Sequence, residues 1–276
     1  MSGGGYFRPR SLAEVWRLEH EHAEALLVAG GTDLLVGGAL ARLERSHALI
    51  SLRRVAELKG IETKERTWIG AATPVAELTS LDAFPVVAQA ARRLGSVQIR
   101  NAATLGGNLC RAAPCADLAP PLLVLEARAE LRSPTGSREV TLEEFFLGPG
   151  ETCLEPGELL AGVWLDPPRP LARGLFLKKG RVKMDLALAS VAVLLETEAK
   201  AVRRVRIAAG SVAPAPIRLR AVEALLEGKG LDPDLMAEAG DLAARSVAPI
   251  SDIRATEAYR RRIVGVYLRR ALQELG

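Results

Sequence analysis

Ala103-Thr104-Leu105-Gly106-Gly107-Asn108-Leu109-Cys110 is the stretch of sequence from which the predicted fold follows. Two adjacent glycines stand between a threonine and an asparagine, and apolar residues flank them on both sides. Glycine adopts positive φ without a Cβ clash and lets backbone N–H groups approach a ligand closely. The stretch therefore predicts a tight backbone turn in a hydrophobic wall, where Thr104 and Asn108 add side-chain donors for an anion.

A second stretch of the same type lies upstream, at Leu27-Val28-Ala29-Gly30-Gly31-Thr32-Asp33-Leu34-Leu35. An apolar run again leads into a glycine pair, a small polar residue and a return to apolar sequence. A Gly-Gly pair alone is more often a plain turn, but two such loops could hold the two phosphates of one dinucleotide. Neither stretch fits G-x-G-x-x-G or G-x-x-x-x-G-K-[ST], so the Rossmann and P-loop fingerprints are absent.

Composition places the chain among soluble globular proteins. It has 276 residues, of which 49% are hydrophobic and 25% charged, and this length allows two or three compact units. The longest largely apolar run, Leu186 to Leu195 with Ser190 within it, is about half of the roughly 20 residues that a membrane-spanning helix needs. Glycines and Tyr6 occupy the place of a signal-peptide core, so we expect a cytoplasmic protein.

The charge of the chain argues against a nucleic-acid partner. The net charge is +4 and the pI is near 9.1, with arginines spread among acids. Few aromatic residues are present to stack on bases, and no basic stripe is interleaved with them. No Ser-His-Asp arrangement and no paired carboxylates stand out on one element, so the sequence predicts no catalytic residue.

The cysteines and histidines predict no metal site. Cys110, Cys115 and Cys153 are too few for a disulfide framework or a four-thiolate iron–sulfur site, and we expect buried thiols. His20 and His22 form a His-x-His pair in a charged segment that we expect to be a strand. We predict no metal site there.

The first 54 residues read as a small βαβ-like module. Ser11 to Glu19 suits a helix with a serine N-cap, and short strands are expected over 25–29 and 48–52, with a short helix over 34–42 between them. The first glycine loop then follows the end of a strand, which is a usual place for a phosphate site.

A second unit is expected from about residue 55. Its predicted elements are a strand over 68–71, a helix capped by Thr73 with Pro74 at its first position, a helix over 85–94, a buried helix over 117–125 capped by Asp117, a hairpin over 129–141 and a helical return over 143–146.

Asp166-Pro167-Pro168-Arg169-Pro170 is stiff and polar and suits a linker, so we place a domain boundary there. The predicted domains are 1–168, with subdomains 1–54 and 55–168, and 169–276. The last domain is expected to hold a three-stranded antiparallel sheet over 174–178, 187–196 and 202–209, followed by three helices: one over 217–226, one starting at Asp232 and Pro233, and one capped by Thr256.

The motifs resemble a known family. AGGTDLLV (29–36) and QIRNAATLGGNLCRAAPCADLAP (98–120), in that order and at that separation, resemble the flavoprotein subunit of the molybdenum hydroxylases. That family comprises the medium subunit of carbon monoxide dehydrogenase, its relatives and the FAD domain of xanthine dehydrogenase. The likeness continues through PGELL (156–160), FLKKGR (176–181) and YRRRIVGVYLRRAL (259–272), so it covers nearly the whole chain.

The resemblance implies a fold and a cofactor. The implied fold is α+β, with a PCMH-type FAD-binding domain of two α/β subdomains followed by a domain with a three-stranded antiparallel sheet and a helix bundle. The implied cofactor is FAD, held non-covalently, because neither glycine loop contains a histidine or cysteine for covalent attachment.

The resemblance also assigns site residues. Both glycine loops would hold the FAD pyrophosphate, through Val28, Ala29, Gly30, Gly31, Thr32, Asp33, Leu34, Thr104, Leu105, Gly106, Gly107 and Asn108. Asp117 matches an acidic residue that hydrogen-bonds the flavin moiety, although it could be only a helix cap. Leu160 and Lys178 match positions that line the isoalloxazine ring, where a lysine would stabilise reduced flavin. Leu160 could equally be a core residue, and whether Lys178 or Lys179 faces the flavin stays open.

The resemblance implies partners as well. A large subunit would carry molybdopterin and oxidise the substrate, and a small iron–sulfur subunit would carry [2Fe–2S] clusters. This chain would pass electrons from those clusters to a soluble acceptor such as NAD⁺, a quinone or oxygen, and we expect the interface near the flavin ring. Two alternatives stay open: a self-contained FAD-dependent oxidoreductase of the same broad fold, and a non-enzymatic ligand-binding or assembly module.

Overall fold

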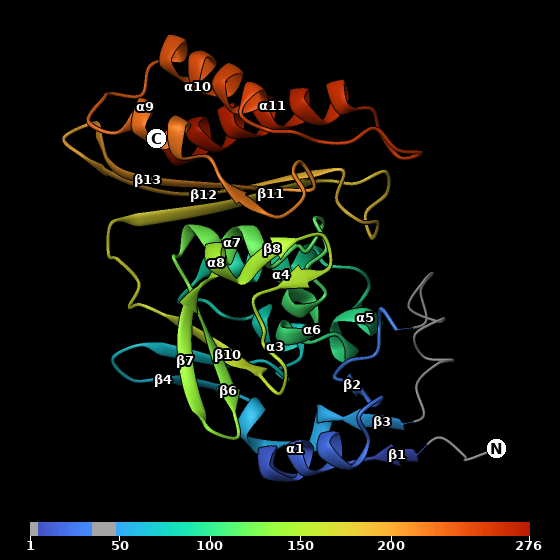
Figure 1. The fold of residues 1–276 in the computed structure, drawn as a ribbon. Coiled ribbons are helices and arrows are strands. Elements are labelled where there is room, and N and C mark those ends of the chain that lie inside the picture. The colour runs from blue at the N-terminus through green and yellow to red at the C-terminus, as the bar shows by residue number, and fades with distance from the viewer. Residues whose placement is uncertain (1–4, 35–47) are drawn as a thin grey trace.

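The computed structural model describes residues 5–34 and 48–276. In this part of the chain a small parallel sheet and two antiparallel sheets lie in succession, with helices between and outside them (Figure 1). This architecture confirms the α+β class. Within the same residues, no helix is long and apolar enough to cross a bilayer.

The amino-terminal part is a parallel sheet with one helix against it. Its elements are β1 (Gly5–Phe7), α1 (Leu12–Glu21), β2 (Leu26–Val28) and β3 (Ala48–Ser51), with strand order β1-β3-β2. Ser11 Oγ accepts a hydrogen bond from Glu14 N–H, so the predicted N-cap is confirmed. The helix expected over 34–42 lies, from residue 35 on, outside the described residues.

The histidine pair lies on this helix and not on a strand. His20 is in the last turn of α1, and His22 is its C-cap and stacks on Phe7 at 4.6 Å between ring centroids. The expected strand was wrong because α1 continues two residues beyond its predicted end.

The central part is built on a five-stranded antiparallel sheet with order β4-β5-β10-β6-β7. The strands are β4 (Ile61–Thr63), β5 (Thr67–Gly70), β6 (Arg128–Ser133), β7 (Gly136–Thr141) and β10 (Leu159–Leu165). The other elements are 3-10 turns η1 (Leu52–Arg54) and η2 (Ala56–Leu58), helices α3 (Val75–Leu78), α4 (Pro85–Arg93), α5 (Val97–Ala102), α6 (Leu105–Cys110), α7 (Ala119–Val124) and α8 (Leu142–Phe145), and the hairpin of β8 (Phe146–Gly148) and β9 (Glu151–Thr152).

Two predicted helix caps in this part were wrong. Pro74 is the N-cap of α3, while the Thr73 hydroxyl bonds the backbone N–H and carbonyl of Gly60 instead. Leu118 is the N-cap of α7, so Asp117 does not cap it. In both places a tertiary partner holds the polar side chain that the local pattern assigned to a helix end.

The carboxyl-terminal part is a four-stranded antiparallel sheet with order β11-β12-β13-β14. Its elements are β11 (Ala172–Lys179), β12 (Ala189–Glu198), β13 (Ala201–Gly210), β14 (Ile217–Arg218), α9 (Arg220–Leu226), α10 (Pro233–Arg245) and α11 (Glu257–Leu275). The three predicted strands are present. Residues 217–218 form a short fourth strand and not the start of a helix, because they pair with Ala208 and Ala209.

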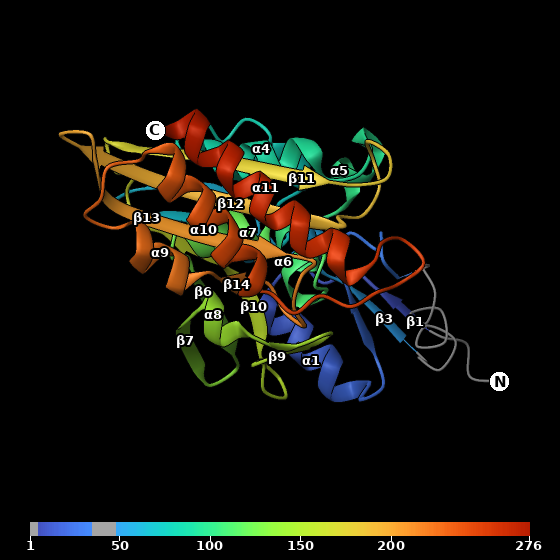
Figure 2. The same ribbon diagram turned by 90° about the horizontal axis from the view of Figure 1, so that it is seen from above.

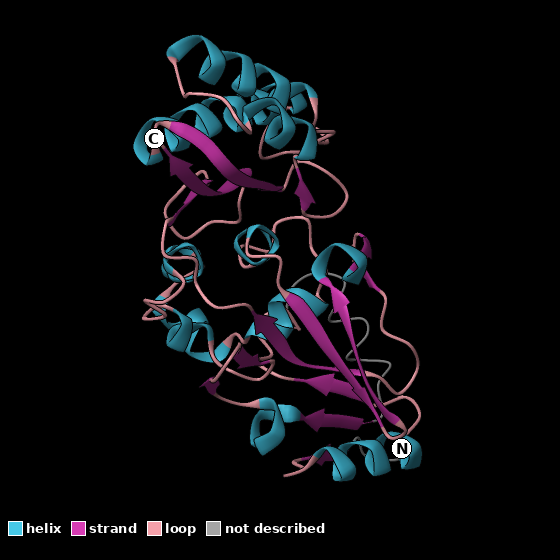
Figure 3. Ribbon diagram, turned by 90° about the vertical axis from the view of Figure 1, so that its left-hand side faces the viewer, coloured by secondary structure: helices cyan, strands magenta, loops and turns pink. Residues whose placement is uncertain are grey.

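Helices cover both faces of this sheet. Helices α9, α10 and α11 lie on its outer face, as Figure 2 shows from above, while α4 and α7 lie on its inner face, toward the central part (Figure 1). Figure 3 shows helices on both sides of this sheet. Side chains of β11 alternate accordingly: Leu175 belongs to the outer core and Phe176 to the inner one. The inner core includes residues on both sides of 168/169, and the division there remains a prediction.

Candidate functional site

The two glycine stretches, far apart in sequence, lie against each other. A Cβ atom on Gly30 would lie 2.2 Å from the carbonyl oxygen of Ala102 and 2.8 Å from Cα of Ala103. Only glycine permits so close an approach between the two backbones. The predicted convergence of the two segments therefore depends on Gly30 as a packing residue.

The first stretch, Ala29–Leu34, is a loop at the carboxyl end of β2 with unused donors. Gly31 has φ of +70°, which favours glycine, and among the described residues a Cβ there would meet only Val28 Cγ1, at 3.7 Å. The amide N–H groups of Gly30, Gly31, Thr32 and Asp33 donate no hydrogen bond to any described residue. Successive free amides in such a loop form a concave anion-binding surface.

The second stretch is not a turn, and this prediction was wrong. Residues 105–110 form α6, Thr104 is its N-cap, and neither Gly106 nor Gly107 has positive φ. The Thr104 hydroxyl accepts a hydrogen bond from Gly107 N–H at 3.0 Å. A threonine followed by two glycines thus acts as a helix start.

The amides at the start of α6 are already used within the protein. Leu105 N–H donates to Thr73 O at 3.0 Å, and Gly106 N–H donates to Ala71 O at 2.7 Å. A Cβ on Gly106 would lie 2.6 Å from Cβ of Ala71, whereas Gly107 is exposed. Gly106 is therefore a packing residue like Gly30, and Gly107 is the glycine of this pair that a ligand can reach.

Arg111 connects the two stretches and is a residue that the sequence did not single out. Its Nε donates to Asp33 Oδ2, and both side chains are about half exposed. Nothing in the local sequence marks this pair, because its members are brought together only by the fold. Cys110, beside it, is exposed as a residue, while burial raises the pKa of its thiol to about 12, as expected for a buried thiol. Cys115 and Cys153 are partly buried, and all three cysteines are free.

Asp117 and Lys178 form a buried ion pair between the loop before α7 and strand β11. Lys178 Nζ lies 2.6 Å from Asp117 Oδ2, and the side chains are only 5% and 6% exposed, respectively. Lys178 also donates to the backbone carbonyl of Arg93 at 3.3 Å. Asp117 Oδ1 is buried and has no hydrogen-bond partner among the described residues, so it is an acceptor without a donor.

The surroundings of Asp117 change its acidity. Burial raises the pKa of this carboxyl group from 3.8 to about 6, and the ammonium group of Lys178 lowers it in part. The position of Asp117 is held by Asn108, whose Oδ1 accepts a hydrogen bond from Leu118 N–H at 3.2 Å. Asn108 thereby links α6 to the buried acid.

The alternation of side chains along β11 determines which of the two lysines points toward the inner core. Lys178 has the same parity on β11 as Phe176, which lies in the inner core, whereas Lys179 has the parity of Leu175 and Leu177 on the side of α11. Lys178 is therefore the inward-facing lysine. Leu160, on β10, is buried in the same inner core as Leu105 and Leu109.

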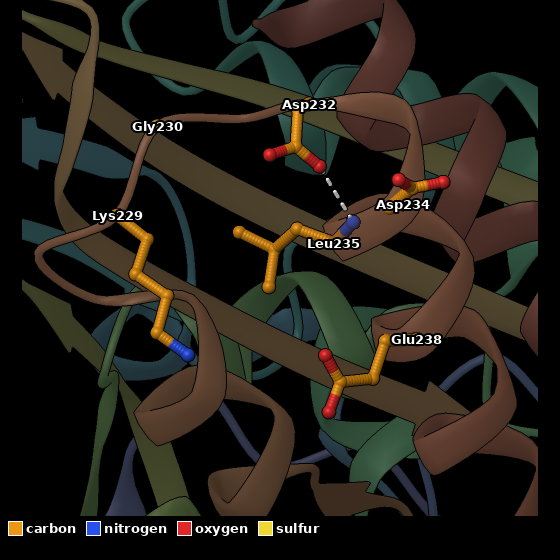
Figure 4. Close-up of a pocket in the computed structure, with 6 residues that line it drawn as sticks. All are labelled: Lys229, Gly230, Asp232, Asp234, Leu235 and Glu238. Atoms are coloured by element: carbon orange, nitrogen blue, oxygen red, sulfur yellow. Dashed lines mark hydrogen bonds between the residues drawn. The ribbon is translucent and has the colours of Figure 1, made fainter.

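A hollow elsewhere on the surface shares no residue with these positions. It is lined by Lys229, Gly230, Asp232, Asp234, Leu235 and Glu238 (Figure 4). Asp232 there accepts a hydrogen bond from Leu235 N–H at 2.7 Å as the N-cap of α10, so its carboxylate has a structural partner. Among the described residues, no group of three or more His, Cys, Asp or Glu side chains could hold a metal ion.

Comparison with known proteins covers the whole length of the chain. Residues 2–167 match the family model of the FAD-binding domain in molybdopterin dehydrogenase, and residues 175–275 match that of the carbon monoxide dehydrogenase flavoprotein C-terminal domain. The chain is 31% identical to the xanthine dehydrogenase FAD-binding subunit of Escherichia coli O157:H7, covering 98% of this chain and 94% of that one. It is also 31% identical to the carbon monoxide dehydrogenase medium chain of Hydrogenophaga pseudoflava, covering 97% and 95%.

The solved structures agree with the sequence comparison. Carbon monoxide dehydrogenase from Hydrogenophaga pseudoflava contains a chain that superposes with a TM-score of 0.93 at 32% identity, covering 98% of this chain and 96% of that one. The chain therefore belongs to the family of FAD-binding medium subunits of xanthine dehydrogenases and carbon monoxide dehydrogenases.

Proposed function

We propose that this chain binds FAD non-covalently and relays electrons from the [2Fe–2S] clusters of a partner subunit to a soluble acceptor. The observation that supports this most is the convergence of residues from separate segments: the free amides of 30–33 at the first glycine stretch, and Asp117 with Lys178 beyond the second. Each residue type suits a different part of one elongated anionic cofactor.

Whether these residues fit FAD can be judged from Asp117 Oδ1, a buried acceptor without a donor. An unpaired buried carboxylate oxygen is costly, and a ligand hydroxyl or ring N–H would satisfy it. FAD carries both kinds of donor, so the residues fit the cofactor. When bound, FAD supplies the group that takes up and gives off electrons.

The residues of this chain then have separate roles. The free amides of Gly30 to Asp33, with Thr32, bind the pyrophosphate, while Thr104 and Gly106 hold α6 in place behind it. Lys178 would supply a positive charge near the isoalloxazine ring and so favour reduction of the bound flavin. Leu160 belongs to the apolar wall that excludes water from the ring.

The partners follow from the relatives. Several are named as medium subunits or medium chains, including the nicotine 6-hydroxylase of Paenarthrobacter nicotinovorans and the glyceraldehyde dehydrogenase of Sulfolobus acidocaldarius. We infer a large molybdenum-binding subunit carrying molybdopterin and a small iron–sulfur subunit. The cytoplasm is the proposed location, where the three free cysteines stay reduced.

FAD content is the first measurement. The purified protein, alone or from cells that co-express the partner genes, should be yellow, and denaturation should release FAD into the supernatant. Colour remaining on the precipitate, or release of FMN, would contradict the proposed cofactor chemistry.

Anaerobic reduction separates the relay from a self-contained oxidoreductase. FAD-loaded chain is mixed without oxygen with xanthine, carbon monoxide, nicotine or glyceraldehyde, the compounds in the names of its relatives, and then with dithionite. Flavin absorbance should fall only with dithionite for the chain alone. It should also fall when the dithionite-reduced, desalted iron–sulfur partner is added. Bleaching of the lone chain by one of the four compounds would favour the self-contained enzyme.

A further inference from the structure

Exposed apolar side chains gather at one end of the carboxyl-terminal sheet. Val182, Met184 and Leu186 come from the loop between β11 and β12, Ile250 and Ile253 from the loop before α11, and Tyr259 from the first turn of α11. Ile253 is 99% exposed and Val182 69%. We call these six residues the apolar patch. Clustered exposed apolar side chains are typical of an interaction surface.

The two loops are held in place by one buried arginine. Arg260, on α11, donates through Nη1 to the carbonyl of Leu188 at 2.6 Å and through Nη2 to Asp252 Oδ1 at 2.8 Å. Leu188 follows the first loop and Asp252 lies in the second. The apolar patch is therefore a preorganised surface, and binding does not have to order both loops first.

The unpaired charges within and around the apolar patch are positive. Its acids are paired: Asp185 with Arg181 at 2.6 Å, Asp252 with Arg254 at 3.0 Å and Glu257 with Arg261 at 2.8 Å. Lys179, Lys183 and Arg262 form no ion pair with any described residue. A complementary partner surface is therefore apolar at its centre and acidic at its rim.

The apolar patch begins next to the proposed flavin site. Its first loop starts directly after Lys178 and Lys179, and Lys178 is the buried partner of Asp117. Figure 1 shows both loops on the same, right-hand side of the molecule as α5, which leads into α6. A protein docked on the apolar patch is thus brought close to the residues that hold the ring.

A second copy of this chain fits this surface poorly. In a two-fold dimer the same residues face each other, so the unpaired Lys183 and Arg262 would approach their own copies. Like charges across an interface disfavour it. An electron-donating partner with an acidic surface fits both the position of the apolar patch next to the proposed flavin site and its unpaired positive charges.

We propose that the apolar patch is the docking surface for the iron–sulfur partner, which meets it with an apolar surface rimmed by acidic side chains. This inference rests on the proposed function. It assigns the contact to the carboxyl-terminal loops in addition to the FAD-binding residues near the ring.

The test uses the complex obtained by co-expression of the three chains. The variant carries Val182→Glu and Ile253→Glu, and the matched control carries Leu147→Glu on β8, where the residue is 65% exposed and belongs to the separate β8–β9 sheet. We expect the patch variant to retain at least tenfold less iron–sulfur subunit, with unchanged Tm and FAD content in the chain itself. The control should assemble like the wild type. Normal assembly of the patch variant, or equal loss in both variants, overturns the inference.

Charge reversal supplies a second, independent measurement. Lys183→Glu with Arg262→Glu should slow association with the iron–sulfur subunit about tenfold at low salt and remove most of its salt dependence. An unchanged rate and salt dependence would count against an acidic rim.

The outcomes also separate this inference from the proposed function. If the wild-type chain binds FAD but never co-purifies with the iron–sulfur subunit, the proposed function fails. If wild type and patch variant both assemble, the docking surface alone fails. Loss of self-association by the patch variant in sedimentation, or loss of binding to phosphatidylserine-containing vesicles, with assembly unaffected, would assign the apolar patch to a second copy or to a membrane surface instead.

Discussion

The two glycine pairs have similar local sequences, but their backbone amide groups differ in hydrogen bonding. Gly30-Gly31 lies in a loop whose amide groups are free, whereas Gly106-Gly107 lies in α6, whose first amides are bonded to Thr104, Thr73 and Ala71. Yet the pairs share one feature. In each, the first glycine packs against another backbone or Cβ and the second is open. The first stretch can therefore bind an anion through its backbone, while the second positions α6 and, through Asn108, the loop that carries Asp117.

The largest expected difference between the two regions is in pH dependence, because only the second leads to a buried acid. The pKa of Asp117 rises from 3.8 in the unfolded chain to about 6 in the folded protein. Between about pH 4 and pH 6 the Asp117 carboxyl group is therefore protonated in the folded protein and ionised in the unfolded chain. The stability from this group is present below about pH 4 and is lost as pH rises through 6, by roughly 3 kcal/mol in all.

Urea unfolding of the flavin-free protein and its Asp117→Asn variant between pH 4.5 and 7.5 measures this effect. The stability of wild type relative to the variant should fall as pH rises, since the variant cannot titrate there. Asp33→Asn, in the first region, is the matched control and should leave the pH profile unchanged. If Asp117→Asn and wild type had the same pH dependence of the free energy of unfolding, Asp117 would not be the group that titrates.

Gly30→Ala should have the next largest effect. Its Cβ would meet the Ala102 carbonyl oxygen at 2.2 Å, a backbone atom that cannot move without shifting α5. We expect a loss of about 2 to 3 kcal/mol in the free energy of unfolding, as for other overpacked sites, and loss of FAD as the two stretches separate. Denaturant titration and FAD release measure both. If the Gly30→Ala variant were as stable as wild type, the two glycine stretches would not be in contact.

Gly31→Val tests the free loop itself. Its φ of +70° is strained for a branched side chain, at a cost of about 1 to 3 kcal/mol, and relaxation of the loop would redirect its amides. We expect FAD affinity to fall at least tenfold, measured by fluorescence titration. Gly136→Val, in the β6–β7 hairpin at φ of +157°, is the control and should leave FAD stoichiometry unchanged.

Gly107→Ala should be close to neutral in stability. Alanine favours a helix by about 1 kcal/mol over glycine, and the only tight neighbour of its Cβ would be Thr104 Oγ1, at 3.0 Å. We expect a change within about 1 kcal/mol of wild type, in contrast to Gly30→Ala. A loss as large as that at Gly30 would show that the second pair is as constrained as the first.

Arg111→Ala should have the smallest effect. The Arg111–Asp33 pair is about half exposed, and such pairs contribute about 0 to 1 kcal/mol. The difference from wild type should vanish in high salt, because salt screens exposed charges. A salt-independent loss would indicate that Arg111 binds the cofactor and not only Asp33.

Local sequence predicted most elements because their signals are local. Ser11, Asp232 and Thr256 were recognised as N-caps, and each accepts the expected backbone hydrogen bond. The segments 174–178, 187–196 and 202–209 were predicted as three antiparallel strands, and β11 to β13 pair in that way. The predictions failed where a distant partner competed: Thr73 bonds Gly60, and Asp117 pairs with Lys178.

The sequence named residues for the candidate site but did not predict how they are arranged. The resemblance named Asp117 and Lys178 separately, whereas their pairing, and the choice of Lys178 over Lys179, came from the packing of β11 between the inner and outer cores. Arg111 was missed because its partner Asp33 lies in another segment. The turn predicted at 104–108 was wrong because a Thr-x-Gly-Gly pattern suits both a turn and a capped helix start.

By itself the sequence determined the family and the class of fold, because motifs, caps and apolar periodicity depend on neighbouring residues; the residues that it names for the site stay a proposal. Tertiary structure alone decided which glycine faces a neighbour and which faces solvent, which amides are free, and which carboxylate oxygen is left without a donor. The physical reason is that hydrogen-bond satisfaction and burial depend on atoms supplied by distant segments: Ala71, Thr73 and Ala102 fix the state of both glycine pairs, and β11 fixes that of Asp117.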